Sequence, residues 1–364
     1  MPEIHGRRRD ALRAHLREHD VDALLVVDLL NIRYLTGFTG SNAALLVHAE
    51  DERRTVFCTD GRYLTQSERQ VPDLERLIER QSTIAVAALA GERGVARTGY
   101  ESQHVTVEQL DELASAAGAK VELVRTPGRV ERLRLIKDDT EVEALRMACA
   151  AADRALAGLI DHGGLAPGRT EREVARDLEN RMLDHGAAGP SFESIVATGA
   201  NSAVPHHRPT DAMLRPGDLV KLDFGALVDG YHSDMTRTVV LGEPAGWQRE
   251  LYDLVAAAQA AGRAALRVGT ATSEVDAAAR KVIEDAGHGE HFLHGLGHGV
   301  GLEIHEAPSL AKTGQGRIAA GMAVTVEPGV YLSGKGGVRI EDTLVVRDDD
   351  PELLTLTTKQ LIVV

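Results

Sequence analysis

The sequence predicts a two-domain α/β protein, with a small N-terminal domain at residues 1–130 and a larger C-terminal domain at residues 131–364. Three observations support this fold class. The length of 364 residues exceeds that of one average domain and suits two. Strand-like and helix-like segments alternate up to about residue 124, as an α/β layer requires. Beyond that point, the order of two helices followed by a strand hairpin occurs twice.

Composition and charge exclude several classes of protein. With 43% hydrophobic and 26% charged residues, the chain has the balance of a globular protein and not of a disordered, collagenous or coiled-coil one. The formal net charge of −14 repels nucleic acid, so we expect no DNA or RNA partner. Residues 1–20 lack the apolar core of a signal peptide, and apolar runs such as 84–90 are too short to cross a membrane. Cys58 and Cys149 are too few for a disulfide framework, which favours a reducing cytoplasm.

The N-terminal third contains the elements of the predicted α/β layer. Apolar periodicity predicts helices at 7–19, 64–70 and 107–117, and continuous apolar runs predict strands at 23–27, 43–47 and 55–58. The turn-forming pair Pro127-Gly128 then interrupts the chain, and a new element begins after it. We therefore expect the domain boundary near residue 130.

Capping boxes mark the first helices of the C-terminal domain. Thr140-x-x-Glu143 and Thr170-x-x-Glu173 each place a hydroxyl and a carboxylate where a helix start needs acceptors for its free amides. The following strands are expected at 219–226 and 232–240, joined by the hairpin signal Asp229-Gly230. The second round consists of helices near 247–266 and 273–286 and strands near 323–327 and 337–346.

Local sequence matches between the two rounds predict an internal duplication. The matches pair Gly168 with Gly269 (101 residues later), Asp223 with Glu327 (104 residues later) and Asp234 with Glu341 (107 residues later). Because the shifts are similar, we expect a C-terminal domain with pseudo-twofold symmetry.

The duplicated acids predict a metal centre. Asp223 and Asp234 lie on two strands of one hairpin, so folding brings their carboxylates near each other. An apolar hairpin tolerates such a pair only when one acid is protonated or a cation lies between them. The repeat predicts the same arrangement at Glu327 and Glu341. Four acids on one central sheet form an oxygen-rich cage suited to two divalent ions, with a nitrogen donor completing it.

Histidines occur in two groups that could supply nitrogen donors or substrate contacts. The glycine-rich segment 294–306 contains His294, His298 and His305, and its glycines argue against a continuous helix. His206 and His207 precede the first hairpin and suit a cleft rim. Each group by itself also fits a surface loop, and Arg339 also fits a simple salt-bridge partner of an acid. The spacing and repetition of the acids favour the functional interpretation.

Taken together, these motifs resemble the pita-bread metallopeptidases. The resemblance lies in Leu222-Asp223-Phe224-Gly225-Ala226, in the segment His232 to Thr238, in Gly295 to Glu306, in Thr325-Val326-Glu327-Pro328-Gly329 and in Gly337 to Thr343. In the N-terminal half, the segments 31–41 and 59–63 resemble the Xaa-Pro dipeptidase (prolidase) and aminopeptidase P branch. The resemblance implies a creatinase-like N-terminal α/β domain followed by a pita-bread catalytic domain.

The resemblance also implies the roles of the site residues. The ligands of two divalent metal ions would be Asp223, Asp234, His298, Glu327 and Glu341, with Asp234 and Glu341 bridging the ions. Family members mostly use manganese or cobalt, and sometimes zinc. His206 and His305 would hold the substrate carbonyl or the developing oxyanion, and Glu327 would carry a proton. Arg339 would fix the substrate or a ligand carboxylate, while the roles of His207 and His294 stay open.

The implied activity is hydrolysis of the peptide bond before proline in Xaa-Pro dipeptides by a hydroxide that bridges the metal ions. The alternative is an aminopeptidase P that acts on longer peptides, because the motifs near the metals are common to both. A more remote alternative is a pita-bread binding module without activity, or a creatinase-like hydrolase. The expected partner is a small peptide with proline at its second position, and the resemblance further implies a homodimer.

Overall fold

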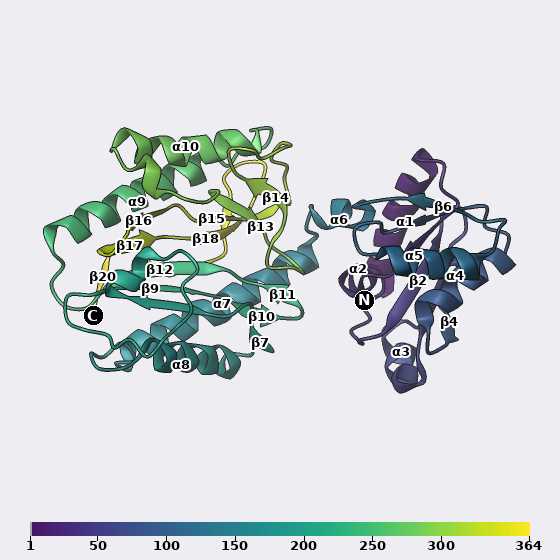
Figure 1. Ribbon diagram of the computed structural model, residues 1–364, viewed down its shortest axis with the longest axis horizontal. Coiled ribbons are helices and arrows are strands. Elements are labelled where there is room, and N and C mark those ends of the chain that lie inside the picture. The colour runs from purple at the N-terminus through teal and green to yellow at the C-terminus, as the bar shows by residue number, and fades with distance from the viewer. Residues whose placement is uncertain (1) are drawn as a thin grey trace. The chain divides into compact units, whose positions relative to one another are not determined.

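The computed structural model describes residues 2–364, and backbone contacts divide the chain into two compact units, residues 1–134 and 135–364 (Figure 1). The boundary expected between residues 130 and 131 falls inside helix α6 (Arg129–Arg134). Because α6 packs on the first two helices of the chain, it belongs to the first unit. We refer to the two units as the N-terminal and the C-terminal domain.

The N-terminal domain is a mixed sheet with helices. The strand order is β4-β3-β2-β1-β5-β6, with β2 antiparallel to both β1 and β3 and the other neighbours parallel. Its elements are α1 (Pro2–Glu18), β1 (Ala23–Val26), α2 (Leu29–Thr36), β2 (Ala43–His48), η1 (Glu52–Arg54), β3 (Val56–Thr59), η2 (Gly61–Tyr63), α3 (Leu64–Gln70), β4 (Glu75–Ile78), α4 (Ser82–Glu92), β5 (Arg97–Tyr100), α5 (Val107–Ala117), β6 (Glu122–Arg125) and α6.

The structure confirms the α/β layer and contains further helices that the sequence pattern did not predict. The helices expected at 64–70 and 107–117 are α3 and α5 with the same bounds. The sequence shows α4 only as an apolar run, because this helix is apolar on most sides and lacks the periodicity of an amphipathic helix. Helix α2 is short and is held at its start by the side chain of Asp28, which accepts from the amide of Asn31.

The C-terminal domain consists of two similar halves. The first half contains α7 (Asp139–Asp161), α8 (Glu171–Asp184), β7 (Gly189–Pro190), β8 (Ile195–Thr198), η3 (Gly199–Ala203), β9 (Leu219–Phe224), β10 (Ala226–Val228), β11 (Tyr231–His232) and β12 (Met235–Val240). The second half contains α9 (Gly246–Ala265), α10 (Thr272–Asp285), η4 (Gly289–His291), β13 (Gly297–Gly299), β14 (Glu306–Leu310), β15 (Ala323–Val326), β16 (Gly329–Leu332), β17 (Gly336–Arg339), β18 (Asp342–Val345), β19 (Glu352–Leu353) and β20 (Ile362–Val363).

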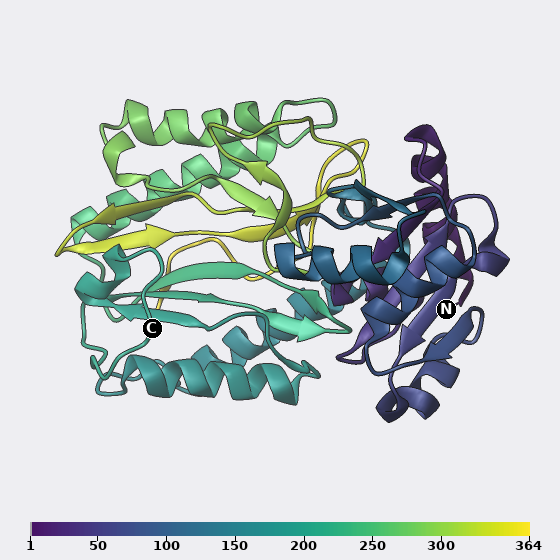
Figure 2. The ribbon, with the colours of Figure 1, turned by 45° about the vertical axis from the view of Figure 1, so that its right-hand side comes forward.

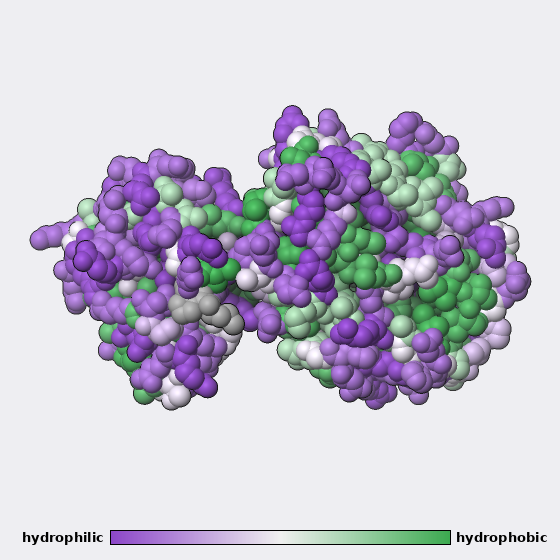
Figure 3. All heavy atoms as spheres, turned by 180° about the vertical axis from the view of Figure 1, so that it is seen from behind, coloured by the Kyte–Doolittle hydropathy of each residue, from purple (hydrophilic) through white to green (hydrophobic). Residues whose placement is uncertain are grey.

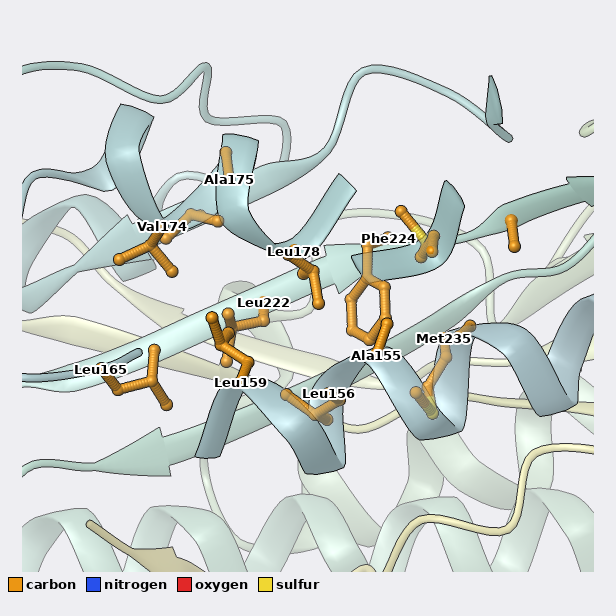
Figure 4. Close-up of a cluster of buried hydrophobic side chains, with 14 of the residues drawn as sticks. Ala155, Leu156, Leu159, Leu165, Val174, Ala175, Leu178, Leu222, Phe224 and Met235 are labelled. Atoms are coloured by element: carbon orange, nitrogen blue, oxygen red, sulfur yellow. The ribbon is translucent and has the colours of Figure 1, made fainter. Parts of the chain in front are cut away.

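The strands of this domain form a layer between two pairs of helices, with α7 and α8 on one side and α9 and α10 on the other (Figures 1 and 2). One sheet has the order β20-β12-β9-β8 and another the order β14-β13-β15-β18-β19. Each half has its own hydrophobic core behind its sheet. Figure 4 shows the core of the first half, where side chains of α7, α8 and β9 gather. Polar strand residues are therefore left to face the junction of the two halves.

Hydrogen bonds repeat between the halves and support the duplication expected from the sequence. The amide of Gly168 donates to the carbonyl of Leu214, and the amide of Gly269 donates to the carbonyl of Ile318, both at 2.8 Å. Both glycines have a positive φ, at 93° and 88°. Nearby residues form an isolated β-bridge in each half, which joins Thr170 to Met213 and Ala271 to Arg317.

One of the two expected capping boxes is correct and the other is displaced. Thr170 caps α8, and Glu173 returns the hydrogen bond, as the sequence predicts. The box at Thr140 and Glu143 is wrong, because α7 is capped two residues earlier by Asp138 with Glu141. The Asp138 carboxylate accepts from the amides of Thr140 and Glu141 at 3.0 and 3.1 Å, so Thr140 already lies within the helix.

The first hairpin turns at the residues that the sequence indicates. Asp229 and Gly230 both have a positive φ, 47° and 75°, and they join Val228 to its partner Tyr231. Gly225 separates β9 from β10, and its backbone passes close to the carbonyl of Ser233. The continuous strands expected at 219–226 and 232–240 are therefore each interrupted once.

Hydrophilic side chains are spread over the surface, with apolar patches on the larger domain, on the face shown in Figure 3. Among residues 2–364, no helix has the length and the apolar character needed to cross a membrane.

Gly225→Ala is expected to destabilise the C-terminal domain. A Cβ at this position would lie 1.8 Å from the Ser233 carbonyl oxygen, so the backbone must shift. We expect a loss of about 1–3 kcal/mol in the free energy of unfolding, measured from the urea midpoint. Gly189→Ala, in the neighbouring strand β7, is the control, because a Cβ there meets nothing within 4 Å. Equal urea midpoints for the two variants would contradict the steric argument.

Candidate metal centre

Strand alternation directs Asp223 toward the junction of the two halves. On β9, Val220, Leu222 and Phe224 pack into the core of the first half. Residues two apart share a face of a strand, so Lys221 and Asp223 lie on the opposite face, together with Leu219 of the other core. Asp223 is 7% exposed. A carboxylate is therefore held where the sheets meet and not in solvent.

The register of the hairpin brings the second acid close to the first. Asp223 lies opposite Thr236 on β12, and Asp234 stands two residues before Thr236, diagonally across from Asp223. The second half repeats this plan, since Glu327 directly follows β15 and Glu341 lies between β17 and β18. The amide of Glu341 donates to the carbonyl of Thr236 at 3.1 Å, which joins the two halves next to the acids.

His298 completes the group. It lies on β13, where its own amide donates to the hydroxyl of Thr325 at 3.2 Å and Nδ1 donates to the carbonyl of Gly299 at 3.0 Å. This leaves Nε2 directed at the acids, 3.5 Å from both Asp234 Oδ2 and Glu327 Oε1. One ligand atom from each of Asp234, His298 and Glu341 lies within 4.8 Å of the other two.

The carboxylates meet the requirements of a cation site. Within residues 2–364, Asp223 Oδ1, Asp234 Oδ1 and Glu341 Oε1 are buried oxygens without a hydrogen-bond partner. Buried acceptors are normally paired, so such oxygens need a compensating group. Carboxylate oxygens with one imidazole form a donor set that suits divalent ions such as Mn²⁺, Co²⁺ and Zn²⁺. These residues thus fit the divalent ions that the sequence predicts.

The pKa shifts of the acids also favour a bound cation. Burial, and then repulsion from Asp223, raises the pKa of Asp234 well above its ordinary value. Burial, and then repulsion from Asp234, does the same to the pKa of Glu341. Burial together with the charge of Glu341 raises the pKa of Glu327 to about 8. The ionised form of all these acids requires positive charge between them.

Arg339 is a fixed positive charge beside the acids. It is 2% exposed, and Nη2 donates a short hydrogen bond to Asp223 Oδ2. Nε lies 3.9 Å from Glu327 Oε2 and donates to the hydroxyl of Thr236 at 3.0 Å, which in turn donates to Glu341 Oε2 at 2.7 Å. Arg339 ends β17, two residues before Glu341, and its guanidinium contacts Asp223 of the other half.

His294 lies behind this arginine and not among the ligands. Arg339 Nη1 donates to the hydroxyl of Tyr331, which donates to His294 Nε2, both at 2.8 Å. His294 Nδ1 donates to the carbonyl of Gly295. Burial, followed by the charge of Arg339, lowers the pKa of His294 to about 3, so the ring is neutral and accepts from Tyr331. Nothing in the sequence pattern marked Tyr331, because its role depends on contacts between separate strands.

A cavity of about 280 Å³ opens beside the acids and collects the remaining predicted residues. His206, His207 and His305 line it together with Arg339. The rings of His298 and His305 meet edge to face, with centroids 4.4 Å apart. Burial and the neighbouring His298 lower the pKa of His305, so this ring is held neutral. The other lining residues are Phe192, Glu193, Ile195, Arg208, Asp223, Asp234, His298, Ile304, Glu327 and Glu341.

Two buried residues of the first half were missed at the sequence level. Lys221 is fully buried, and burial followed by the charge of Arg339 lowers its pKa to about 6. Glu171 is also fully buried, and although burial opposes this, hydrogen bonds from Thr198 and Asn201 hold its pKa below the ordinary value. A lysine and a glutamate in a sequence are usually exposed, so neither position carried a signal.

Comparison with known proteins identifies the class to which this fold and site belong. A family model described as metallopeptidase family M24 matches residues 143–348, and one described as the creatinase/prolidase N-terminal domain matches residues 8–136. The chain belongs to metallopeptidase family M24 and is a metallopeptidase. This finding confirms the fold class and the family that the sequence motifs resemble, and membership implies divalent metal ions.

Individual relatives cover nearly the whole chain. The Xaa-Pro dipeptidase of Pyrococcus furiosus is 32% identical over 364 residues, which cover 98% of this chain and 99% of the relative. Among solved structures, an Xaa-Pro dipeptidase from Bacillus anthracis has a TM-score of 0.94 at 38% identity, covering 99% of this chain and 100% of the other. An X-Pro aminopeptidase from Thermotoga maritima has a TM-score of 0.88 at 31% identity, with coverage of 98% and 99%.

Chelation is expected to lower the unfolding temperature of the C-terminal domain. A cation that binds only the folded state adds about 2.7 kcal/mol to the free energy of unfolding when its concentration is 100 times its Kd. Without the cation, repulsion between the buried carboxylates destabilises the folded state. Calorimetry with Mn²⁺ and with a chelator measures the difference. Glu341→Gln removes one negative charge, so the unfolding temperatures with Mn²⁺ and with the chelator should lie closer together than in the wild type. The same unfolding temperature of the wild type under both conditions would contradict a cation site.

Proposed function

We propose that the protein hydrolyses the peptide bond before proline in Xaa-Pro dipeptides, with two divalent metal ions as cofactors. The observation that carries this proposal is the convergence of acids from both halves on one cavity, with buried carboxylate oxygens that lack partners within the described residues. The names of full-length relatives support the choice of an Xaa-Pro substrate.

We assign Asp223, Asp234, His298, Glu327 and Glu341 as the residues that would hold the metal ions. The support is that Asp234, His298 and Glu341 share one group of ligand atoms, while Asp223 and Glu327 flank it at equivalent positions of the repeat. We propose Mn²⁺ as the native ion, although the donor set also accepts Co²⁺ or Zn²⁺. The ions would supply Lewis-acid polarisation of the scissile carbonyl and acidification of water.

The residues around the ligands orient the substrate and move protons. His206 and His305 line the cavity, and we assign them to donate hydrogen bonds to the carbonyl oxygen as negative charge develops on it. A neutral His305 retains one N–H for this purpose. Glu327 would accept the proton of the attacking water on a carboxylate oxygen and deliver it to the leaving proline nitrogen. Arg339 would hold Asp223 in place through their hydrogen bond.

The size of the cavity suits a small ligand. Its volume of about 280 Å³ is close to the roughly 300 Å³ at which the usual range of ligand sites begins. The peptide bond before proline lacks an N–H group. A general peptidase that recognises this donor cannot bind such a bond, so its hydrolysis needs a dedicated site.

A second candidate is an Xaa-Pro aminopeptidase that accepts longer peptides. The similarity to the X-Pro aminopeptidase from Thermotoga maritima supports it, since that protein is 31% identical over nearly the full chain. A binding module without activity, or a creatinase-like hydrolase, is disfavoured because such proteins typically lose ligand residues, and all the acids stand in their motifs here.

Assembly and compartment belong to the same proposal. We propose a homodimer, on the basis of the family resemblance. Cys58 and Cys149 are both free and buried, and burial raises the pKa of each thiol. Two unpaired thiols of this kind suit a reducing cytoplasm.

Hydrolysis of Ala-Pro and of Ala-Pro-Ala by the purified protein tests the proposal. We expect cleavage of Ala-Pro in the presence of Mn²⁺, loss of that cleavage on chelation, and no cleavage of the tripeptide, because a dipeptidase must exclude a longer chain. Product release is measured by chromatography. Cleavage of the tripeptide would favour the aminopeptidase, and cleavage of neither peptide would favour the binding module.

Asp223→Ala and His206→Ala separate metal binding from substrate contact. Asp223→Ala should lose activity and bound metal together. His206→Ala should lower kcat by about 10²-fold or more, the usual effect of removing one oxyanion donor, while metal content stays near that of the wild type. Elemental analysis and steady-state kinetics measure both. Metal loss in His206→Ala would make His206 a ligand, and full activity with normal metal content in Asp223→Ala would refute the ligand assignment.

A further inference from the structure

The segment that carries His206 is held from two sides by the buried side chains of Glu171 and Lys221, which are not among the proposed metal ligands. This segment, residues 198–210, is the first part of the connection from β8 to β9, the strand that bears Asp223, and it contributes both His206 and His207 to the cavity. It has little regular structure beyond η3, so its backbone needs other restraints to hold a side chain accurately.

Glu171 restrains the two ends of the segment. It is the first residue of α8 and is fully buried. Its Oε1 accepts from the amide of Thr198 and the side-chain amide of Asn201, both at 2.9 Å. Its Oε2 accepts from His207 Nε2 at 2.7 Å and from the amide and hydroxyl of Thr210 at 2.9 and 2.7 Å. One carboxylate therefore ties the beginning of the segment to its end.

Lys221 restrains the middle of the segment. Its Nζ donates to the carbonyls of Val204 and Pro205, at 2.6 and 3.1 Å, and lies 5.1 Å from the ring centroid of Tyr331. Arg339 Nη1 donates to the same Pro205 carbonyl at 3.2 Å. Hydrogen bonds from the buried side chains of Lys221 and Arg339 thus fix the two peptide units directly before His206, and His206 itself lines the cavity.

The internal repeat gives this arrangement an independent parallel. Lys221 stands two residues before Asp223, and its equivalent 104 residues later is Thr325, two residues before Glu327. The hydroxyl of Thr325 accepts from the amide of His298 at 3.2 Å. In both halves, then, the side chain two residues before a central acid holds the backbone at a histidine of the site.

We propose that Lys221 and Glu171 are positioning residues that act through His206, by clamping residues 198–210 so that the imidazole meets the substrate carbonyl. The inference rests on the proposed role of His206 in peptide hydrolysis. Neither Lys221 nor Glu171 lines the cavity, so neither needs to touch the substrate. Displacement of a contact group by about 1 Å can lower a rate by about 100-fold, so such restraint has a measurable effect.

A double-substitution cycle on the metal-loaded enzyme tests the proposal. Lys221→Met keeps the length of the side chain but removes its donors, and should lower kcat for Ala-Pro by at least about tenfold, with less change in KM and no loss of metal. When His206→Ala is already present, Lys221→Met should lower kcat by about twofold at most, because the group it positions is gone. Tyr252→Phe is the control, since it removes another buried hydrogen bond, to the carbonyl of Lys359, and should leave kcat unchanged.

The outcomes separate the two hypotheses. If the wild type cleaves neither Ala-Pro nor Ala-Pro-Ala, the proposed function itself fails. If the wild type is active but Lys221→Met and His206→Ala reduce kcat independently, Lys221 does not act through His206 and the positioning role is overturned. Metal loss in Lys221→Met would likewise overturn it.

Glu171→Gln makes the same measurement from the opposite side of the segment, should Lys221→Met not fold. Glu171→Gln replaces a carboxylate that accepts from His207 and Thr210 by an amide that also carries donors. As for Lys221→Met, its effect on kcat should be much smaller when His206→Ala is already present. An unchanged kcat in Glu171→Gln would contradict the clamp.

Discussion

The structure of the C-terminal domain depends on the burial of like charges where its two halves meet. Asp223, Asp234 and Glu341 are each less than a tenth exposed, and burial is the largest cause of the raised pKa of the last two. Carboxylates in such a place are tolerated only with compensating positive charge and hydrogen bonds. Arg339 supplies a permanent part of that charge, and Thr236 links it to Glu341. Among the described residues, the oxygens that still lack a partner would be compensated by the divalent ions that membership of family M24 implies.

The duplicated architecture makes this burial possible. Each half places an apolar core behind its sheet, and strand alternation then puts the polar residues on the face toward the other half. Backbone and side-chain hydrogen bonds join the halves beside the acids, as when the Thr343 hydroxyl donates to the carbonyl of Asp234 at 2.8 Å. Neither half contains a complete site. The cluster of acids forms only where both halves are packed together.

The groups assigned to the substrate are organised differently from the acids. The acids lie on or directly beside strands, whereas His206 and His305 lie outside the regular strands. A residue in such a segment gains accuracy only from contacts with buried neighbours. Hydrogen bonds from Glu171, Lys221 and Arg339 to residues 198–210 provide such contacts. Neither Glu171 nor Lys221 belongs to the motifs that resemble the family.

Sequence alone determined the local elements and the spacing of the acids. The helix starts at Thr170 and Val107, the turn at Asp229-Gly230 and the repeat shifts near 104 follow from patterns of neighbouring residues, and the structure contains all of them. The start of α7 was misplaced because Asp138 competed with Thr140 for the cap. The contact of Arg339 with Asp223, the hydroxyl of Tyr331 and the burial of Lys221 were decided only by tertiary structure. Each of these features depends on contacts between residues that are far apart in the sequence. A pattern of neighbouring residues does not specify such contacts.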